Sequence, residues 1–308
     1  MFKPALLLIP LVLCSCAAPR QESVAARSDD QPAAEALFPV RVENHFEYMD
    51  RTGKLVLHGP YAAASRFSEG LAAVQVKRAE KVGYIDTTGK MVIPLQFDLG
   101  DPFSEGFAGV MINHQWGYID KTGKVIIPFM FDVGGPFVNG RAAVAAGPTQ
   151  EYGFVNTKGE YVSPARYNMA YPYREGLASV RSFAERFKFV DMDGKVAIPP
   201  QFLEGGEFGD GLAPVQAQTP EGVRWGFVDK TGKMAIPATY TNASMFVNGL
   251  APVQTLAGKW GFIDTKNTMV INPQWDQARI FTYGLAQVWL GDKFGYIGTD
   301  GKYVREIQ

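Results

Sequence analysis

The sequence predicts an all-β protein made of a tandem array of about eight three-stranded antiparallel meanders, with a period of about 35 residues. Three observations predict this fold class. A hairpin sequence recurs along the chain, a second glycine motif lies between successive hairpins, and the spacing within each unit is nearly invariant. Long helical periodicity is absent, which excludes a helical repeat.

The hairpin is clearest at residues 116–128, Trp-Gly-Tyr-Ile-Asp-Lys-Thr-Gly-Lys-Val-Ile-Ile-Pro. Its first four residues predict a strand, the next four a type I turn closed by a glycine at positive φ with a G1 bulge, and the rest a returning strand. The copies begin at Phe46, Val82, Tyr152, Phe187, Trp225, Trp260 and Phe294. In one unit Asn267 replaces the turn glycine, and asparagine is the residue that best tolerates the left-handed conformation after glycine.

The second motif has the form Phe-x-x-Gly-Leu-Ala-x-Val and predicts a turn glycine followed by a buried strand. It occupies residues 67–74, 103–110, 137–144, 173–180, 208–215, 246–253 and 281–288. Residues 39–42 take the place of its strand in the first unit. Each unit therefore consists of this strand followed by the two strands of the hairpin.

The spacing separates a rigid part of each unit from a variable part. The turn glycine, or Asn267, is seven positions after the Trp position. The second glycine is seventeen positions further on, and the valine follows it by four positions. All variation, from six to ten residues, lies between that valine and the next Trp position. Because insertions are tolerated where backbone is not packed, these variable segments predict loops gathered on one face, which is the candidate interaction surface.

Residue types within the frame have predicted roles. The aromatic residue at the Trp position is expected to be buried, and the glycine beside it to permit close approach of a neighbouring strand. The prolines Pro94, Pro128, Pro164, Pro199, Pro237 and Pro273 are expected to end the third strand. A three-stranded unit of this size is marginal alone, so stacking on its neighbours must supply the core.

This pattern resembles the WG repeat family, also called KWG repeats, named for the pair seen at Trp116-Gly117, Trp225-Gly226 and Trp260-Gly261. The resemblance covers about residues 38–308. It implies an exported bacterial protein of variable repeat number, with no common activity established for the family and an interaction role. The chain departs from the pattern at Phe46-Glu47, with His58 in place of proline, and at Phe187-Lys188. Variable repeat number favours an open, solenoid-like array. The alternative is a closed eight-bladed propeller-like ring with a short fourth strand in the crossover from proline to phenylalanine.

The N-terminal segment has the layout of a secretory signal, with Lys3, an apolar run from Ala5 to Leu13 and then small residues. Leu13-Cys14-Ser15-Cys16 resembles the lipobox of bacterial lipoproteins, which implies a signal peptide over residues 1–16 and lipid attachment at Cys16. Ala17 stands where an aspartate would favour inner-membrane retention, so the expectation is a lipoprotein of the cell envelope, in the outer membrane on its periplasmic or surface side. An ordinary cleaved signal and an uncleaved anchor are the alternatives. The polar residues 17–37 predict a flexible tether, followed by the repeat domain at 38–308.

Composition excludes several classes of function. A net charge of −1 gives no electrostatic case for binding nucleic acid, and the two cysteines both lie in the N-terminal segment, so the repeats hold no disulfide framework. The three histidines, His45, His58 and His114, are read as scattered surface residues. The turn aspartates are read as turn formers rather than a calcium ladder. No metal, cofactor or catalytic residue is predicted.

The predicted function is therefore a non-catalytic, lipid-anchored envelope protein, expected to be a monomer, whose repeats bind or scaffold a protein or a cell-wall polysaccharide. The alternatives are an enzyme with a site on the variable-loop face and a passive spacer. Trp289 begins a variable segment and is the tryptophan best placed to act as a sugar platform. The candidate binding residues of this face are Lys77, Arg78, Arg181, Arg186, Arg224 and Trp289.

Overall fold

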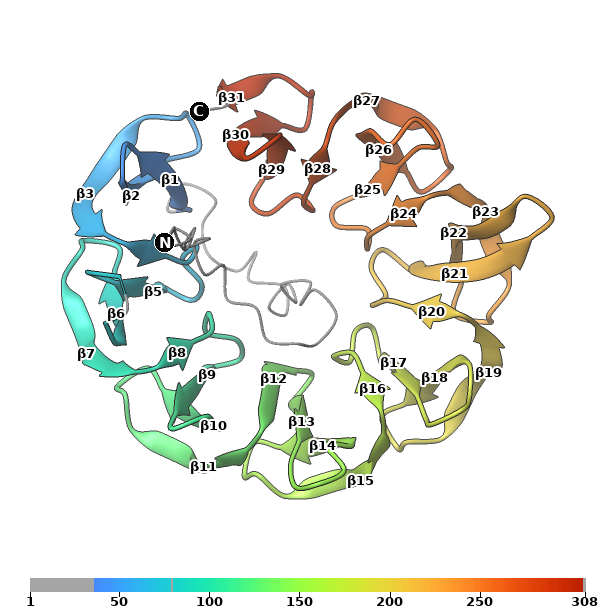
Figure 1. Cartoon of the computed structure of the whole chain (residues 1–308), viewed down its shortest axis with the longest axis horizontal. Coiled ribbons are helices and arrows are strands. Elements are labelled where there is room, and N and C mark those ends of the chain that lie inside the picture. Colours follow the sequence, from blue (N-terminus) through green and yellow to red (C-terminus); the bar gives the residue numbers. More distant parts are fainter. Residues whose placement is uncertain (1–35, 79, 307–308) are drawn as a thin grey trace, which may run out of the picture.

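The computed structural model describes residues 36–78 and 80–306. These residues form eight antiparallel sheets, of which the first has three strands and the other seven have four. The sheets stand like blades around a central axis, and the chain passes once around the ring from blade 1 to blade 8 (Figure 1). The fold is therefore an eight-bladed β-propeller.

The strands follow one another in chain order from the inner to the outer side of each blade. Blade 1 consists of β1 (Phe38–Val42), β2 (His45–Met49) and β3 (Leu55–Tyr61). Blade 2 consists of β4 (Ala63–Ala64), β5 (Leu71–Gln75), β6 (Val82–Asp86) and β7 (Met91–Phe97). Blade 3 consists of β8 (Leu99–Gly100), β9 (Phe107–Ile112), β10 (Gln115–Asp120) and β11 (Val125–Phe131). Blade 4 consists of β12 (Val133–Val138), β13 (Arg141–Ala145), β14 (Tyr152–Asn156) and β15 (Tyr161–Tyr167).

The second half of the ring repeats this order. Blade 5 consists of β16 (Met169–Ala170), β17 (Leu177–Arg181), β18 (Phe187–Asp191) and β19 (Val196–Phe202). Blade 6 consists of β20 (Glu204–Gly205), β21 (Ala213–Thr219), β22 (Gly222–Val228) and β23 (Met234–Tyr240). Blade 7 consists of β24 (Asn242–Ala243), β25 (Leu250–Gln254), β26 (Trp260–Asp264) and β27 (Met269–Trp275). Blade 8 consists of β28 (Gln277–Ala278), β29 (Leu285–Leu290), β30 (Lys293–Gly298) and β31 (Tyr303–Arg305).

The ring is closed, so the open array favoured from repeat number is wrong and the closed ring is correct. Blade 8 packs against blade 1 through one apolar cluster that contains Phe38 and Met49 together with Leu285 and Tyr296. The short fourth strand expected in a closed ring exists, but it follows the aromatic residue that ends the previous blade rather than lying between proline and phenylalanine. Within residues 36–78 and 80–306 blade 1 has no such innermost strand, and Arg66 of blade 2 donates a hydrogen bond to Thr282 of blade 8 at 3.3 Å.

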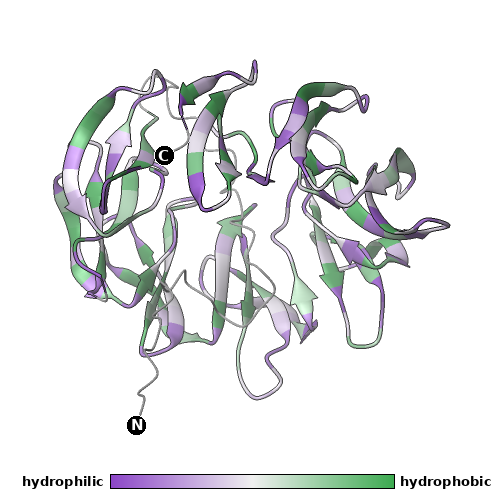
Figure 2. Cartoon of the chain, turned by 45° about the horizontal axis from the view of Figure 1, so that its top comes forward, coloured by the Kyte–Doolittle hydropathy of each residue, from purple (hydrophilic) through white to green (hydrophobic). Residues whose placement is uncertain are grey.

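The hydrophobic core is divided among the eight interfaces between blades. One cluster of buried residues lies at each interface, and in Figure 2 hydrophobic and hydrophilic residues alternate along the strands. Stacking on neighbours therefore supplies the core, as predicted. Ala36, which the sequence assigned to the tether, is 2% exposed and belongs to the cluster at the closing interface.

The most deeply buried ring is not the one at the Trp position but the one two residues later. This ring is 4% exposed or less in every blade, whereas Trp225 and Trp260 at the Trp position are only partly buried. It contacts the aromatic residue before the glycine turn of the next blade, as in Tyr118 with Phe137 at 4.9 Å between centroids. Where the ring is a tyrosine, its hydroxyl donates to a carbonyl of the next blade, and the bond from Tyr296 to Pro39 at 2.7 Å repeats this contact across the closing interface.

The turn between the two hairpin strands has the predicted conformation. The Asp120 carboxylate accepts hydrogen bonds from the Thr122 amide and hydroxyl and from the Lys124 amide, and the Gly123 amide donates to the Asp120 carbonyl. Gly123 has a φ of 86°, and Asn267 in the equivalent place has a φ of 67°. The asparagine exception therefore adopts the left-handed conformation that the turn requires.

The prolines do not end the third strand, contrary to the prediction. β7 continues through Pro94 to Phe97, because a bulge places three of its residues opposite Gly83. A Cβ on Gly83 would lie 2.6 Å from the Ile93 carbonyl oxygen, so the glycine permits this close approach. β7 is the outermost strand and has no partner on its other side, so the missing N–H of proline costs no ladder hydrogen bond and the proline discourages strand addition at this edge.

Candidate functional site

The variable segments lie on one face of the ring, which we call the variable-loop face. Each connects the second and third strands of a four-stranded blade, and antiparallel alternation places these connections at the end of the blade opposite both glycine turns. Three segments are tight or extended hairpins rather than loops, and one of them is the two-residue turn Gly291-Asp292 between the paired residues Leu290 and Lys293. Asn113 and His114 form a two-residue turn at positive φ, and β21 and β22 extend as paired strands as far as Thr219 and Gly222.

Blades 5 to 8 expose an apolar side chain on each of their variable segments. Phe183 between β17 and β18 is 86% exposed, and Leu256 between β25 and β26 is 68% exposed. Val223 at the tip of β22 and Leu290 at the end of β29 are also exposed. Isolated exposed apolar residues are normal, and the outer strands carry others, such as Val125 and Val270. The four tips differ in lying on one face of four consecutive blades, which makes them the candidate contact site.

The predicted cations lie in two groups on this face. Lys77 and Arg78 are exposed between β5 and β6 on blade 2, which blade 1 separates from blade 8 and which lies across the ring from blade 6. Lys77 forms an ion pair with Glu80 at 3.4 Å. Arg186 is exposed in the same variable segment as Phe183, whereas the Arg181 guanidinium lies 4.9 Å from the Phe187 ring centroid.

Two other predicted residues are engaged within the fold. Arg224 lies in β22 and donates to the carbonyl of its neighbour Val223 at 2.8 Å. Trp289 is half-buried in β29, with the Arg279 guanidinium 5.2 Å from its ring centroid and the Phe294 ring 5.9 Å away. A sugar platform requires an open ring face, and these neighbours cover part of this ring.

The sequence interpretation missed a polar cluster between the inner parts of blades 5 and 6. The Arg174 guanidinium Nε donates to Glu207 Oε2 at 2.5 Å, and both side chains are less than one tenth exposed. Burial raises the pKa of Glu207, against the attraction of Arg174. Beside this pair, the Tyr171 hydroxyl donates to Glu204 Oε1 at 3.2 Å, and burial also raises the pKa of the Glu204 carboxyl.

A signal for this cluster exists in the aligned repeats. Arg174 stands where two blades have Ser68 and Ser104, and Glu207 stands where three have proline. The pair lies just before the glycine turns, at the end of the blades opposite the variable-loop face. It therefore does not form a titratable site on the predicted surface.

Two of the three histidines are brought together, which corrects the reading of them as scattered. His45 Nε2 lies 3.0 Å from Glu47 Oε1, and His58 Nδ1 lies 2.8 Å from Glu47 Oε2. The hydrogen bond with His45 is the largest influence that lowers the pKa of Glu47. Within residues 36–78 and 80–306, no cluster of three or more histidine, cysteine or acidic residues has the arrangement of a metal site.

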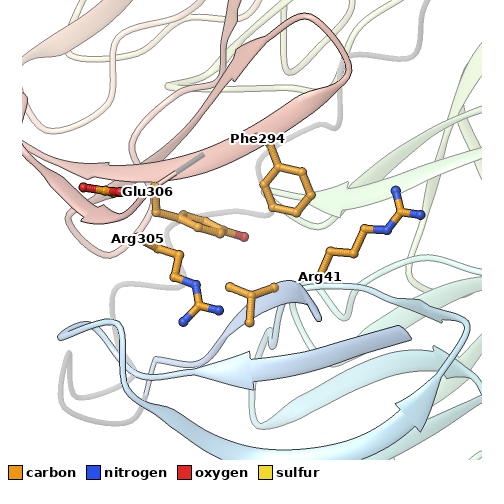
Figure 3. Close-up of a pocket in the computed structure, with 6 residues that line it drawn as sticks. Arg41, Phe294, Arg305 and Glu306 are labelled. Carbon is orange, nitrogen blue, oxygen red and sulfur yellow. The ribbon is translucent and has the colours of Figure 1, made fainter. Parts of the chain in front are cut away.

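The interface that closes the ring is filled rather than hollow. Figure 3 shows Phe294 of blade 8 approaching blade 1, with Arg41 and Arg305 on either side of the space between the blades. That space holds about 10 Å³, roughly the room for one water molecule. The space that these residues line is therefore too small for a ligand larger than water.

Signals for lipidation and export fall on residues 1–35, which lie outside the described residues, so Cys16 and the signal peptide remain predictions. Among the residues that are described, no helix has the length and apolar character needed to cross a bilayer.

Comparison with known proteins identifies the repeat. The model of the family described as WG containing repeat matches residues 48–77, 83–113, 116–145, 152–182, 189–217, 225–260 and 260–294. No curated protein matches the chain.

Solved structures share the fold at low identity. The dihydro-heme d1 dehydrogenase NirN, solved in complex with DHE, is similar with a TM-score of 0.58 and 12% identity over 94% of this chain and 75% of NirN. The computationally designed Ika8 protein is similar with a TM-score of 0.51 and 11% identity over 92% of this chain and 98% of Ika8. At such identities the likeness shows a shared fold and carries no activity from one protein to the other.

Proposed function

Because the chain belongs to the WG containing repeat family and folds as an eight-bladed propeller, we propose that it is a non-catalytic binding platform of the cell envelope that holds a protein partner on its variable-loop face. The observation that carries this proposal is the row of apolar tips on blades 5 to 8, led by Phe183 and Leu256. Desolvation of such side chains provides binding free energy of about 25 cal/mol per Å².

The charge distribution supports a protein rather than a polysaccharide partner. Lys77 and Arg78 lie on the same face as the apolar tips but on other blades, so an acidic region of the partner can be steered without being buried. A glycan site would need an open aromatic platform, and the Trp289 ring is partly covered by Arg279 and Phe294.

The envelope location is part of the proposal and rests on the sequence. The segment ending at Cys16 has the order of charge, apolar run and small residues of a lipoprotein signal. A Cys16→Ser variant is expected to move from the membrane fraction to the soluble periplasmic fraction. Retention of that variant in the membrane fraction would contradict a lipid anchor at Cys16.

The partner is tested by crosslinking in membranes followed by purification and mass spectrometry. The variant Phe183→Ser/Leu256→Ser removes the two most exposed tips, and Val270→Ser is the matched control because Val270 is 50% exposed on the outer strand β27. We expect one protein to be captured by the wild type and by the control, and at least tenfold less by the double variant. Equal capture by all three forms would contradict the proposed surface, and a peptidoglycan pulldown that depends on Trp289 would favour the glycan alternative.

A further inference from the structure

Two departures from the repeat meet between blades 4 and 5. Five other blades carry an isoleucine on the outermost strand, at Ile93, Ile127, Ile198, Ile236 and Ile271, whereas blade 4 has Ser163. In blade 5, Lys188 replaces the glycine of the Trp-Gly pair. Both changes place polar groups at one blade interface.

In those five blades the isoleucine side chain fills the space between its blade and the next one. An Ile127 methyl lies 2.9 Å from the position of a Cβ on Gly159 of the next blade, and an Ile198 methyl lies 2.7 Å from that of Gly232. At Gly194 of blade 5 the nearest atoms are Arg166 Nη2 at 3.7 Å and Ser163 Oγ at 3.8 Å. The smaller serine therefore leaves open the space that isoleucine fills at the other interfaces.

A cleft of about 350 Å³ lies at this interface, near the lower limit of the volumes typical of small-molecule sites. Its walls include Tyr167, Val190 and Val196, and its two cationic groups are Arg166 and Lys188. Ser163 is 5% exposed, and its hydroxyl has no hydrogen-bond partner although buried hydroxyls nearly always have one. The hydroxyl lies beside Gly194, which is part of the cleft lining.

The charges of the cleft do not balance. Lys188 Nζ lies 2.6 Å from Glu185 Oε2 and 3.5 Å from the Ser182 hydroxyl. The Arg166 guanidinium donates only to neutral oxygens, the Tyr167 hydroxyl at 2.9 Å and the Gly194 carbonyl at 3.4 Å. Two positive groups therefore face one carboxylate, and that carboxylate is on an exposed loop residue.

We propose that this cleft binds the oxyanion group of a small molecule, a carboxylate or a phosphate. The ammonium of Lys188 and the guanidinium of Arg166 provide charge-assisted hydrogen bonds, and the apolar walls accommodate the body of a small organic anion. In the free protein the Lys188 ammonium is paired with the Glu185 carboxylate, so a bound anion must displace that carboxylate. This competition gives the proposal a distinctive consequence, because removing the Glu185 charge should strengthen binding.

The test is calorimetric titration of the purified protein at constant ionic strength with benzoate, inorganic phosphate and neutral benzamide. Three variants restore residues that other blades use, so the fold should tolerate them: Lys188→Gly as at Gly117, Arg166→Gln as at Gln96, and Ser163→Ile as at Ile127. Each should weaken anion binding at least tenfold, because Lys188→Gly and Arg166→Gln each remove a charge-assisted hydrogen bond and Ser163→Ile fills the space that serine leaves open. Glu185→Gln should strengthen it several-fold, and Arg186→Gln, an exposed cation of the same loop outside the lining, should leave it unchanged.

The outcomes separate the possibilities. Binding of benzoate but not benzamide, lost in the three restored variants, supports an organic anion, and the same pattern with phosphate supports a phosphate group. Absence of binding by both anions would overturn the proposal. So would binding that Lys188→Gly and Arg166→Gln leave intact, or that Glu185→Gln weakens. The assay uses only small anions, so failure here is independent of the protein partner proposed above.

Discussion

Removal of one member of the buried Arg174–Glu207 pair tests how much this departure from the repeat constrains the fold. Breaking a buried ion pair costs about 3 to 5 kcal/mol, because the remaining charge is left without a partner. The two side chains are 9% and 8% exposed, so water replaces little of the lost contact. Arg174 Nη2 already lacks a hydrogen-bond partner, which favours the lower end of the range. For Arg174→Met we expect a loss of about 3 kcal/mol, or roughly 6 to 12 °C in apparent melting temperature.

The penalty should depend on pH in a defined direction. Burial raises the pKa of Glu207 above that of an exposed carboxyl, and the attraction of Arg174 opposes this rise. Arg174→Met removes the opposing influence, so the pKa of Glu207 rises further. A carboxyl with a raised pKa in the folded state contributes stability that is complete below its unfolded pKa and is lost as pH rises through the folded pKa. The variant should therefore be penalised most at about pH 8 and least at about pH 4.

The assay is urea unfolding of wild type and variants, followed by tryptophan fluorescence across this pH range. The double variant Arg174→Ser/Glu207→Pro reproduces Ser68 and Pro102, which occupy these places between blades 2 and 3. It should recover most of the stability lost by Arg174→Met, because no buried charge remains. Equal penalties at all pH values, or a double variant as unstable as the single one, would refute this reasoning.

Two further predictions address the closing interface and the turns. Tyr296→Phe removes the hydroxyl that donates to the Pro39 carbonyl and should cost about 1 kcal/mol in urea unfolding, as should Tyr118→Phe, which removes the same contact inside the ring. If Tyr118→Phe lowers the free energy of unfolding and Tyr296→Phe leaves it unchanged, blades 8 and 1 do not meet in solution. The Thr122 hydroxyl lowers the pKa of Asp120, so the stability that this carboxylate contributes is present above its unfolded pKa and lost as pH falls. Asp120→Asn, which copies the natural asparagine of blade 4 at Asn156, should preserve the turn and reduce the loss of urea stability between pH 7 and pH 3. A loss as large as that of wild type would contradict this role.

The local structure of each repeat was predictable because it depends on neighbouring residues. Asp120, Thr122 and Gly123 form their turn within five residues. Because the turn requires a residue with positive φ, Asn267 could be recognised as the replacement for the turn glycine. Ring closure was not predictable, since it depends on the small rotation between neighbouring sheets. The prediction that the prolines end the third strand failed for the same reason, because it too depends on how strands are arranged in the sheet. Whether Pro94 ends a strand depends on which edge is free and on the bulge opposite Gly83, and neither is a local property.

The candidate sites were only partly accessible from sequence. Fixed spacing predicted a common face for the variable segments, and the fold places them there. Of the residues that form the cleft and the buried ion pair, only Lys188 was recognised from the sequence as a departure from the repeat, although Ser163, Arg174 and Glu207 also depart from it. Their convergence was not visible, because Arg174 and Glu207 are 33 residues apart and meet only when blades stack.

The closing interface joins the two ends of the ring without exchanging a strand. Among the described residues, β1 pairs only with β2, and β31 pairs only with β30. Every sheet is consequently encoded by one uninterrupted stretch of sequence. Duplication or deletion of a single such stretch adds or removes a whole blade and splits none, and a circular permutant opened between any two blades retains every sheet. Copy number in this architecture can therefore evolve one unit at a time, limited by the geometry of closure.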